Sequence, residues 1–144
     1  MGESELRRRI QGFILSFGLL ASDRTPCGLP ITVSQAHALQ MLGESEGITQ
    51  QTLASRLRLD KSTTSRLVAS LVERGWLLKA RGELDRREAH LALSASGRAL
   101  LAEIRKAAEA RFGDVLARIP ADRRADVLEA LDILIAAVEP RETA

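Results

Sequence analysis

Residues 60–79, DKSTTSRLVASLVERGWLLK, decide how this chain folds. Asp60 is a favourable N-cap residue, and the apolar and small side chains after it recur at the i, i+3, i+4 spacing of a helix with one buried face. The residues expected on that face are Thr64, Leu67, Val68, Leu71 and Val72. Gly75 follows the pattern, and a glycine is common just past the end of a helix. The stretch therefore predicts an amphipathic helix.

The opposite face of this helix carries short or cationic side chains and no acid. It consists of Lys61, Ser62, Ser65, Arg66 and Ala69. A face that meets only water usually mixes Glu with Lys, whereas short polar and basic side chains suit close approach to phosphates and to base edges in a DNA major groove. On this stretch alone, the alternative is an ordinary helical hairpin with a solvated face.

A shorter helix is expected just upstream. Thr49 can cap it, and Leu53, Ala54 and Leu57 would form its buried stripe. Only residues 58–59 remain before Asp60, so the connection must be a tight turn. Two helices joined in this way, the second polar and basic on its free face, fit a helix-turn-helix.

Two strands are expected downstream, over residues 76–80 and 89–93, with the leucines of the second alternating inward. The connecting segment, RGELDRRE, contains Arg81, Arg86 and Arg87. A β-hairpin tipped with arginines beside a helix-turn-helix is a wing, because an arginine is attracted by the negative potential of a narrow minor groove. The alternative is a solvated, salt-bridged turn worth under about 1 kcal/mol.

An acid in the same segment has a role in this interpretation. Asp85 paired with Arg87 would hold the guanidinium in one orientation and reduce the entropy lost on binding. Arg86 is the second choice for the arginine that enters the groove.

The charge distribution agrees with a DNA-reading face. Of the 144 residues, 21 are Lys or Arg and 19 are Asp or Glu. Residues 56–90 hold nine basic and five acidic residues, a net charge of +4, which leaves −2 for the rest of the chain. Aromatic residues are few and Tyr is absent, which argues against a single-strand or RNA platform built on stacking rings.

The flanking segments predict three more helices with wide apolar faces. One is expected over residues 5–22, and a long one begins after Ser94 as its N-cap. A break around Pro120 separates it from the last, which is expected between Ala121 and Pro140. Thr32 and Gln35 have the spacing of a capping box at the start of a further helix. The terminal apolar faces exceed what one small module can cover, so a two-fold homodimer that intertwines these helices is expected.

Three stretches of the chain resemble a known protein family. DKSTTSRLVASLVERGWL (60–77) and DRREAHLALSASG (85–97) resemble the recognition helix and wing of the MarR family of bacterial winged-helix transcription regulators, and ITVSQAHALQML (31–42) is similar to that family's second helix. Thr64 departs from the pattern, because relatives often carry an apolar residue there. The fold class implied is mainly α with a small β-hairpin wing (α+β). Its expected parts are an N-terminal dimerisation helix and loop (1–30), a winged helix-turn-helix core (31–97) and C-terminal dimerisation helices (98–144).

The resemblance also implies partners and site residues. The expected partner is double-stranded DNA with an inverted repeat, and the expected output is repression. The DNA-binding residues would be Lys61, Ser62, Thr63, Ser65, Arg66, Arg81, Arg86 and Arg87, with Asp85 bracing the wing. A small-molecule or oxidant signal would act between the terminal dimerisation helices and the winged helix-turn-helix core. Candidate ligand-binding residues are Phe13, Phe17, Cys27, His37 and Met41.

Other functions find little support in the sequence. Two histidines, one cysteine and no phosphate-binding glycine loop give an enzyme no catalytic parts, and no cofactor is expected. Cys27, His37 and Glu44 match no recurrent metal spacing, so no metal is expected. The single cysteine and the absence of an apolar run of roughly 20 residues favour a cytoplasmic protein without membrane contact. A winged-helix module used only for protein contacts stays open as the alternative.

Overall fold

The computed structural model describes residues 2–81 and 89–141. Its elements, in chain order, are α1 (Glu3–Phe17), α2 (Val33–Glu44), β1 (Ile48–Thr49), α3 (Gln50–Leu57), α4 (Lys61–Glu73), β2 (Leu77–Arg81), β3 (Ala89–Leu93), α5 (Ala95–Arg118), the 3-10 turn η1 (Ala121–Arg123) and α6 (Arg124–Val138). The chain is mainly helical with one small antiparallel sheet, which confirms the predicted fold class.

Side-chain caps start the helices of the central region at the predicted residues. Thr32 and Gln35 form the complete capping box of α2, with both hydrogen bonds at 3.0 Å. The Thr49 hydroxyl accepts from the Thr52 N–H at 3.1 Å and so caps α3. Asp60 caps α4 through a 2.7 Å hydrogen bond from the Thr63 N–H. These bonds satisfy donors that the first turn of a helix leaves unpaired.

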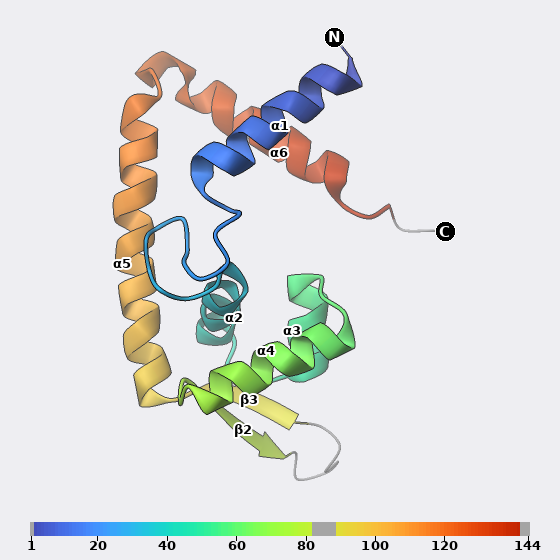
Figure 1. Ribbon diagram of the computed structural model, residues 1–144, viewed down its shortest axis with the longest axis vertical. Helices are drawn as coiled ribbons and strands as arrows, with labels where there is room; N and C mark the ends of the chain where they lie inside the picture. Colours follow the sequence, from blue (N-terminus) through green and yellow to red (C-terminus); the bar gives the residue numbers. More distant parts are fainter. Residues whose placement is uncertain (1, 82–88, 142–144) are drawn as a thin grey trace. The chain divides into compact units, whose positions relative to one another are not determined.

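The sheet has the strand order β1-β3-β2, with both pairs antiparallel. Figure 1 shows β2 and β3 beside α4. Strand β2 begins at Leu77 and not at Trp76 as predicted, because the Trp76 N–H is bonded to the Leu71 carbonyl at the end of α4. The sequence analysis also missed β1, which has only two residues and pairs Ile48 with Leu91. A strand of this length has no periodicity to detect.

One apolar core lies among α2, α3, α4, the sheet and the start of α5. Leu39, Leu53, Leu71 and Leu91 have no exposed surface in it. Thr64 is also fully buried, and its hydroxyl donates to the Asp60 carbonyl at 2.8 Å. The prediction for α4 holds except at Val72, which is 41% exposed. Its position at the edge of the apolar arc explains the difference.

A buried amide joins α2 to α4. Gln35 Nε2 donates to Ser70 Oγ at 3.4 Å, while Gln35 Oε1 accepts from the Thr32 N–H. The Ser70 hydroxyl in turn donates to the Leu67 carbonyl at 2.7 Å. Gln35 therefore takes part in the N-terminal cap of α2 and also binds a side chain of α4.

The start of α5 is pressed against the end of the α4–β2 turn. The Ser94 hydroxyl accepts from the Gly97 N–H at 3.0 Å, as predicted for an N-cap, and donates to the Gly75 carbonyl at 2.5 Å. A Cβ atom on Gly97 would lie 2.0 Å from the Trp76 carbonyl oxygen. Only glycine permits this approach, which accounts for Gly97 at the end of the stretch LALSASG (91–97).

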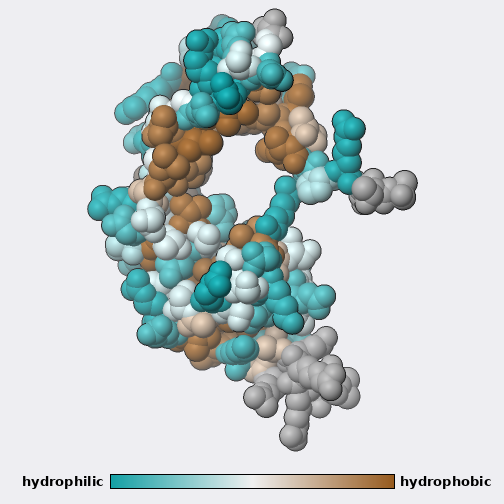
Figure 2. All heavy atoms as spheres, turned by 45° about the vertical axis from the view of Figure 1, so that its right-hand side comes forward, coloured by the Kyte–Doolittle hydropathy of each residue, from teal (hydrophilic) through white to brown (hydrophobic). Residues whose placement is uncertain are grey.

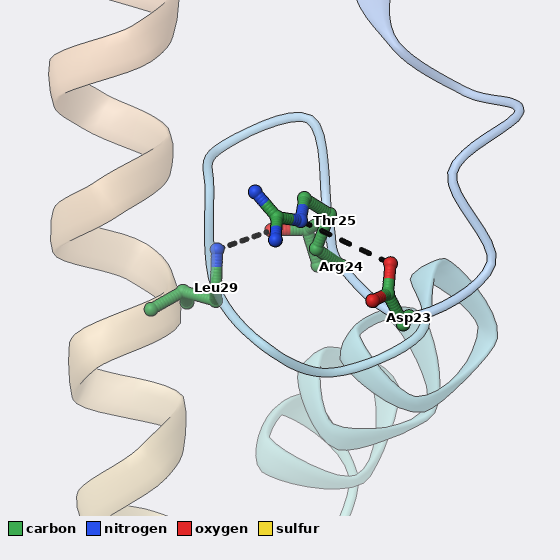
Figure 3. A network of polar contacts seen from close by, with 4 residues as sticks. All are labelled: Asp23, Arg24, Thr25 and Leu29. Carbon is green, nitrogen blue, oxygen red and sulfur yellow. Dashed lines mark hydrogen bonds and ion pairs between the residues drawn. The ribbon is translucent and has the colours of Figure 1, made fainter.

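The loop between α1 and α2 contains a compact turn that hydrogen bonds between Thr25 and Leu29 close (Figure 3). Buried Thr25 accepts through its hydroxyl from the Leu29 N–H at 3.2 Å, and its own N–H donates to the Leu29 carbonyl at 2.9 Å. Beside it, Arg24 Nε lies 3.9 Å from Asp23 Oδ1. Cys27 is a free, half-buried thiol.

The helix predicted over residues 5–22 is shorter than expected. It ends at Phe17, because Gly18 adopts a left-handed conformation with φ of 87°. The N–H groups of Gly18 and Leu19 both return to the Ile14 carbonyl, at 3.2 Å each, which closes the helix end.

The chain forms two compact units, Met1–Ala107 and Ala108–Ala144, and the boundary falls within α5. In the second unit, Pro120 separates α5 from η1 and α6, as predicted. Within the described residues, every helix is too short or too polar to traverse a lipid bilayer.

Candidate nucleic-acid interface

Helix α4 presents the polar face that the sequence predicted. All five residues predicted for this face are exposed: Lys61, Ser62, Ser65, Arg66 and Ala69. Thr63 is half-buried, because its hydroxyl turns back toward the N-cap. The buried face of the same helix is fixed in the core, so this polar face has one orientation relative to the sheet.

A network of hydrogen bonds surrounds Asp60 at the start of this face. Asp60 Oδ1 accepts from the Thr63 N–H at 2.7 Å and from the Ser62 hydroxyl at 3.0 Å. Asp60 Oδ2 accepts from the Thr63 hydroxyl at 2.9 Å, and Arg66 Nη2 lies 3.4 Å from that hydroxyl oxygen. The Thr63 backbone N–H, followed by the Thr63 and Ser62 hydroxyls, lowers the pKa of Asp60 below its ordinary value.

A groove of about 520 Å³ lies beside the first turn of α4. It is lined by residues from three parts of the motif: Thr49, Gln50, Gln51 and Ala54 from the start of α3, Lys61 and Thr64 from α4, and Lys79 and Ala89 from the hairpin. Two lysines from different elements therefore border one concave surface. Phosphate oxygens are the natural partners of such a pair.

Lys79 was missed by the sequence analysis. It lies two residues after buried Leu77 on β2, and residues two apart point to the same face of a sheet. This alternation could have shown that Lys79 extends on the α4 side, beyond the edge of the core.

The wing residues are only partly described. Arg81 is the last residue of β2 and pairs with Ala89 in the register of the hairpin. Arg86, Arg87 and Asp85 lie outside the described residues. Their roles as the minor-groove arginine and its brace remain predictions.

The five candidate ligand-binding residues occupy different settings. The rings of Phe13 and Phe17 stack on α1, with centroids 5.3 Å apart. Cys27 lies in the loop, His37 is exposed on α2, and Met41 packs against the core one turn later. None of the five lines the groove beside α4.

Comparison with known proteins agrees with this architecture. The MarR family model matches residues 31–89. An HTH-type transcriptional regulator of Mycobacterium tuberculosis is 29% identical over 110 residues, which cover 76% of this chain and 77% of that protein. These relatives are transcriptional regulators and not enzymes.

Solved structures show the same fold over nearly the whole chain. The PcaV transcriptional regulator of Streptomyces coelicolor, solved with its natural ligand, is 26% identical with a TM-score of 0.73, over 96% of this chain and 95% of that one. The transcriptional repressor CouR, solved on a 23-mer DNA duplex, is 26% identical with a TM-score of 0.70, over 92% and 89% of the two chains. The chain is therefore similar to MarR-family transcriptional regulators, in sequence over residues 31–89 and in fold over nearly its whole length.

Proposed function

We propose that this chain acts as a homodimeric repressor that binds a short inverted repeat in duplex DNA and leaves it when a small molecule or an oxidant is present. Two copies of α4 would read the two half-sites, roughly one helical turn of DNA apart. The observation that carries the proposal is the face of α4, where hydroxyl and cationic side chains are exposed while the opposite face is locked in the core.

Affinity and sequence choice would come from different side chains. Lys61, Lys79 and Arg81 would contact phosphates, together with Arg86 and Arg87 of the wing, and supply the salt-dependent part of binding. Ser62, Thr63, Ser65 and Arg66 would face base edges. The DNA-bound CouR structure supports duplex DNA as the partner of this fold.

Uncovered apolar side chains support the homodimer. Figure 2 shows apolar side chains, in brown, exposed at the surface. In the first unit Leu6, Phe13 and Leu15 of α1 are more than half exposed, and in the second unit the same is true of Leu128, Ile133, Ile135 and Val138 of α6. Uncovered apolar helix faces of this kind are uncommon on monomeric proteins, so a second copy is the expected cover.

The release signal would act on the arm and loop side of the molecule. PcaV was solved with a natural ligand, which supports a small-molecule effector for this fold. Phe13, Phe17, His37 and Met41 are the candidate contacts of such an effector, and Cys27 is the candidate oxidant sensor.

The test is an anisotropy titration of the protein against duplex DNA from its own promoter region, with random duplex as the reference. We expect tighter binding to the promoter fragment, and we expect Arg66→Ala to remove most of that preference. Arg118→Ala, which removes an exposed cation from the end of α5, is the matched control. If neither the promoter nor a site selected from random duplexes is preferred, the protein-contact interpretation of the winged helix replaces this one.

The signal is tested in the same assay with peroxide and with Cys27→Ser. Loss of binding in peroxide for the wild type alone would assign the switch to Cys27. If peroxide changes the binding of neither protein, an oxidant is excluded as the signal and a small-molecule effector remains.

A further inference from the structure

Two hydroxyl groups at the start of α4 already donate their hydrogens within the protein. The Ser62 hydroxyl donates to Asp60 Oδ1 at 3.0 Å, and the Thr63 hydroxyl donates to Asp60 Oδ2 at 2.9 Å. Both residues belong to the face that the proposed function assigns to base reading. The direction in which the two hydroxyl hydrogens point therefore decides which base groups these residues can recognise.

The direction of these bonds follows from the chemistry of the partners. An ionised carboxylate only accepts hydrogen bonds, whereas a hydroxyl has one hydrogen and two lone pairs. Asp60 is ionised at neutral pH, and the bonds that it accepts favour that state. Each hydroxyl must therefore direct its hydrogen at Asp60 and can offer only lone pairs outward.

Acceptor-only hydroxyls do not suit phosphate. Phosphate oxygens also only accept, so neither hydroxyl can bind one without giving up Asp60, and the Asp60 charge repels phosphate in addition. In the major groove the donors are the exocyclic amino groups of adenine and cytosine, while the nearby groups of guanine and thymine are acceptors.

We propose that Asp60 is a specificity-determining positioning residue, because it holds the Ser62 and Thr63 hydroxyls as acceptors that select adenine or cytosine and reject guanine or thymine. The inference rests on the proposed function, in which this face of α4 reads base edges. Arg66 Nη2, 3.4 Å from Thr63 Oγ1, occupies part of one lone pair and leaves the other for the base.

Replacement of Asp60 by asparagine separates the two hydroxyls. Asparagine is as good an N-cap as aspartate, so its carbonyl oxygen should keep the place of Oδ1, where the Thr63 N–H and the Ser62 hydroxyl are bound. Its amide nitrogen then replaces Oδ2 and donates to Thr63 Oγ1. The Thr63 hydrogen becomes free to point outward, whereas the Ser62 hydrogen stays where it was.

The experiment is site selection from a random duplex library with the wild type and four variants. Thr63→Val and Ser62→Ala identify the base positions that depend on each hydroxyl, and Ser96→Ala, which changes an exposed serine of α5, is the matched control. We expect the wild type to prefer adenine or cytosine at both positions by roughly fivefold or more. Asp60→Asn should move the preference to guanine or thymine at the Thr63 position alone.

Several outcomes would overturn the inference while leaving the proposed function intact. These are a wild-type preference for guanine or thymine at the Thr63 position, an Asp60→Asn preference identical to the wild type there, or a Thr63→Val profile that matches the wild type at every position. A wild type that enriches no sequence would instead remove the proposed function, and this inference with it. Thermal unfolding of each variant, compared with the wild type, shows that the fold is retained.

Discussion

At the scale of the residue, Thr64 shows how a polar side chain can stand in an apolar stripe. It has no exposed surface, and its hydroxyl returns to the Asp60 carbonyl one turn back. That carbonyl also accepts the Thr64 N–H at 3.0 Å, so the hydroxyl bond is not its only partner. The methyl group is then the part of the side chain on which packing depends.

Two substitutions at this position test that interpretation. Thr64→Ser removes the methyl and should lower the free energy of unfolding by about 1 kcal/mol, because one buried carbon is lost. Thr64→Val keeps the shape and should be close to neutral. Urea unfolding of both variants measures the difference, and a larger loss for the valine variant would show that the hydroxyl matters more than the methyl.

Asp60 makes stability depend on pH in a predictable direction. Its pKa in the folded protein is lowered from the ordinary value of 3.8 by the hydrogen bonds from Thr63 and Ser62. A lowered folded pKa means that the stabilisation is present above the ordinary value and is lost as the pH falls from there through the folded value. The free energy of unfolding of the wild type, relative to that of Asp60→Asn, should therefore fall in that acid range.

Urea titrations at several pH values on both sides of 3.8 measure this difference. Asp132→Asn on α6 is the matched removal of an exposed carboxylate. A relative free energy of unfolding that stays constant down to the lowest pH would contradict the assignment.

At the scale of the element, the groove beside α4 assigns a role to two lysines from different elements. Lys61 begins α4 and Lys79 lies on β2, and both line the same concave surface. If each neutralises one phosphate, replacement by alanine should weaken binding to all sequences and reduce the slope of log K against log salt by about 1. Lys106→Ala, on the exposed side of α5, should leave the slope unchanged.

The junction between the hairpin and α5 gives a second prediction at this scale. The space at Gly97 is filled by the backbone of Trp76, which cannot move aside as a flexible side chain can. Gly97→Ala should therefore cost about 3 kcal/mol or more of stability. Gly113→Ala, later in the same helix with open space around it, should be neutral or stabilising by thermal unfolding.

The elements that the sequence predicted are those with local signals. The caps at Thr32, Thr49, Asp60 and Ser94 and the breaks at Gly75 and Pro120 each depend on neighbouring residues. The errors lie where the structure depends on contacts between residues that are far apart in the sequence. Two-residue β1 forms only because β3 is beside it, and Val72 is exposed because tertiary packing ends before it.

The candidate site was predictable to a similar extent. Periodicity placed Lys61, Ser62, Ser65 and Arg66 on the free face of α4, since a helix has only one way to bury its apolar stripe. The orientation of the Thr63 hydroxyl toward Asp60 and the meeting of Lys79 with Lys61 required coordinates. Both depend on distances between side chains that spacing in the sequence does not fix.

At the scale of the whole molecule, the uncovered faces of the terminal helices predict self-association. Leu128→Glu combined with Ile135→Glu places two charges on one face of α6, where both residues are more than half exposed. Sedimentation should show a dimer for the wild type and a monomer for this variant. Ala130→Glu, which adds a charge to a different face of the same helix, should remain dimeric; a wild-type monomer at micromolar concentration would contradict the homodimer.

The bond between Gln35 and Ser70 has a consequence for redesign. If a whole α4 were transplanted from a relative, the residue that replaced Ser70 would have to accept the hydrogen bond of the Gln35 amide. Where it could not, the exchange would also need a substitution at Gln35 in α2. The exposed positions carry no such tie to the core. New DNA preferences are therefore best introduced by substituting the exposed residues of the existing helix, which leaves its packing against the core unchanged.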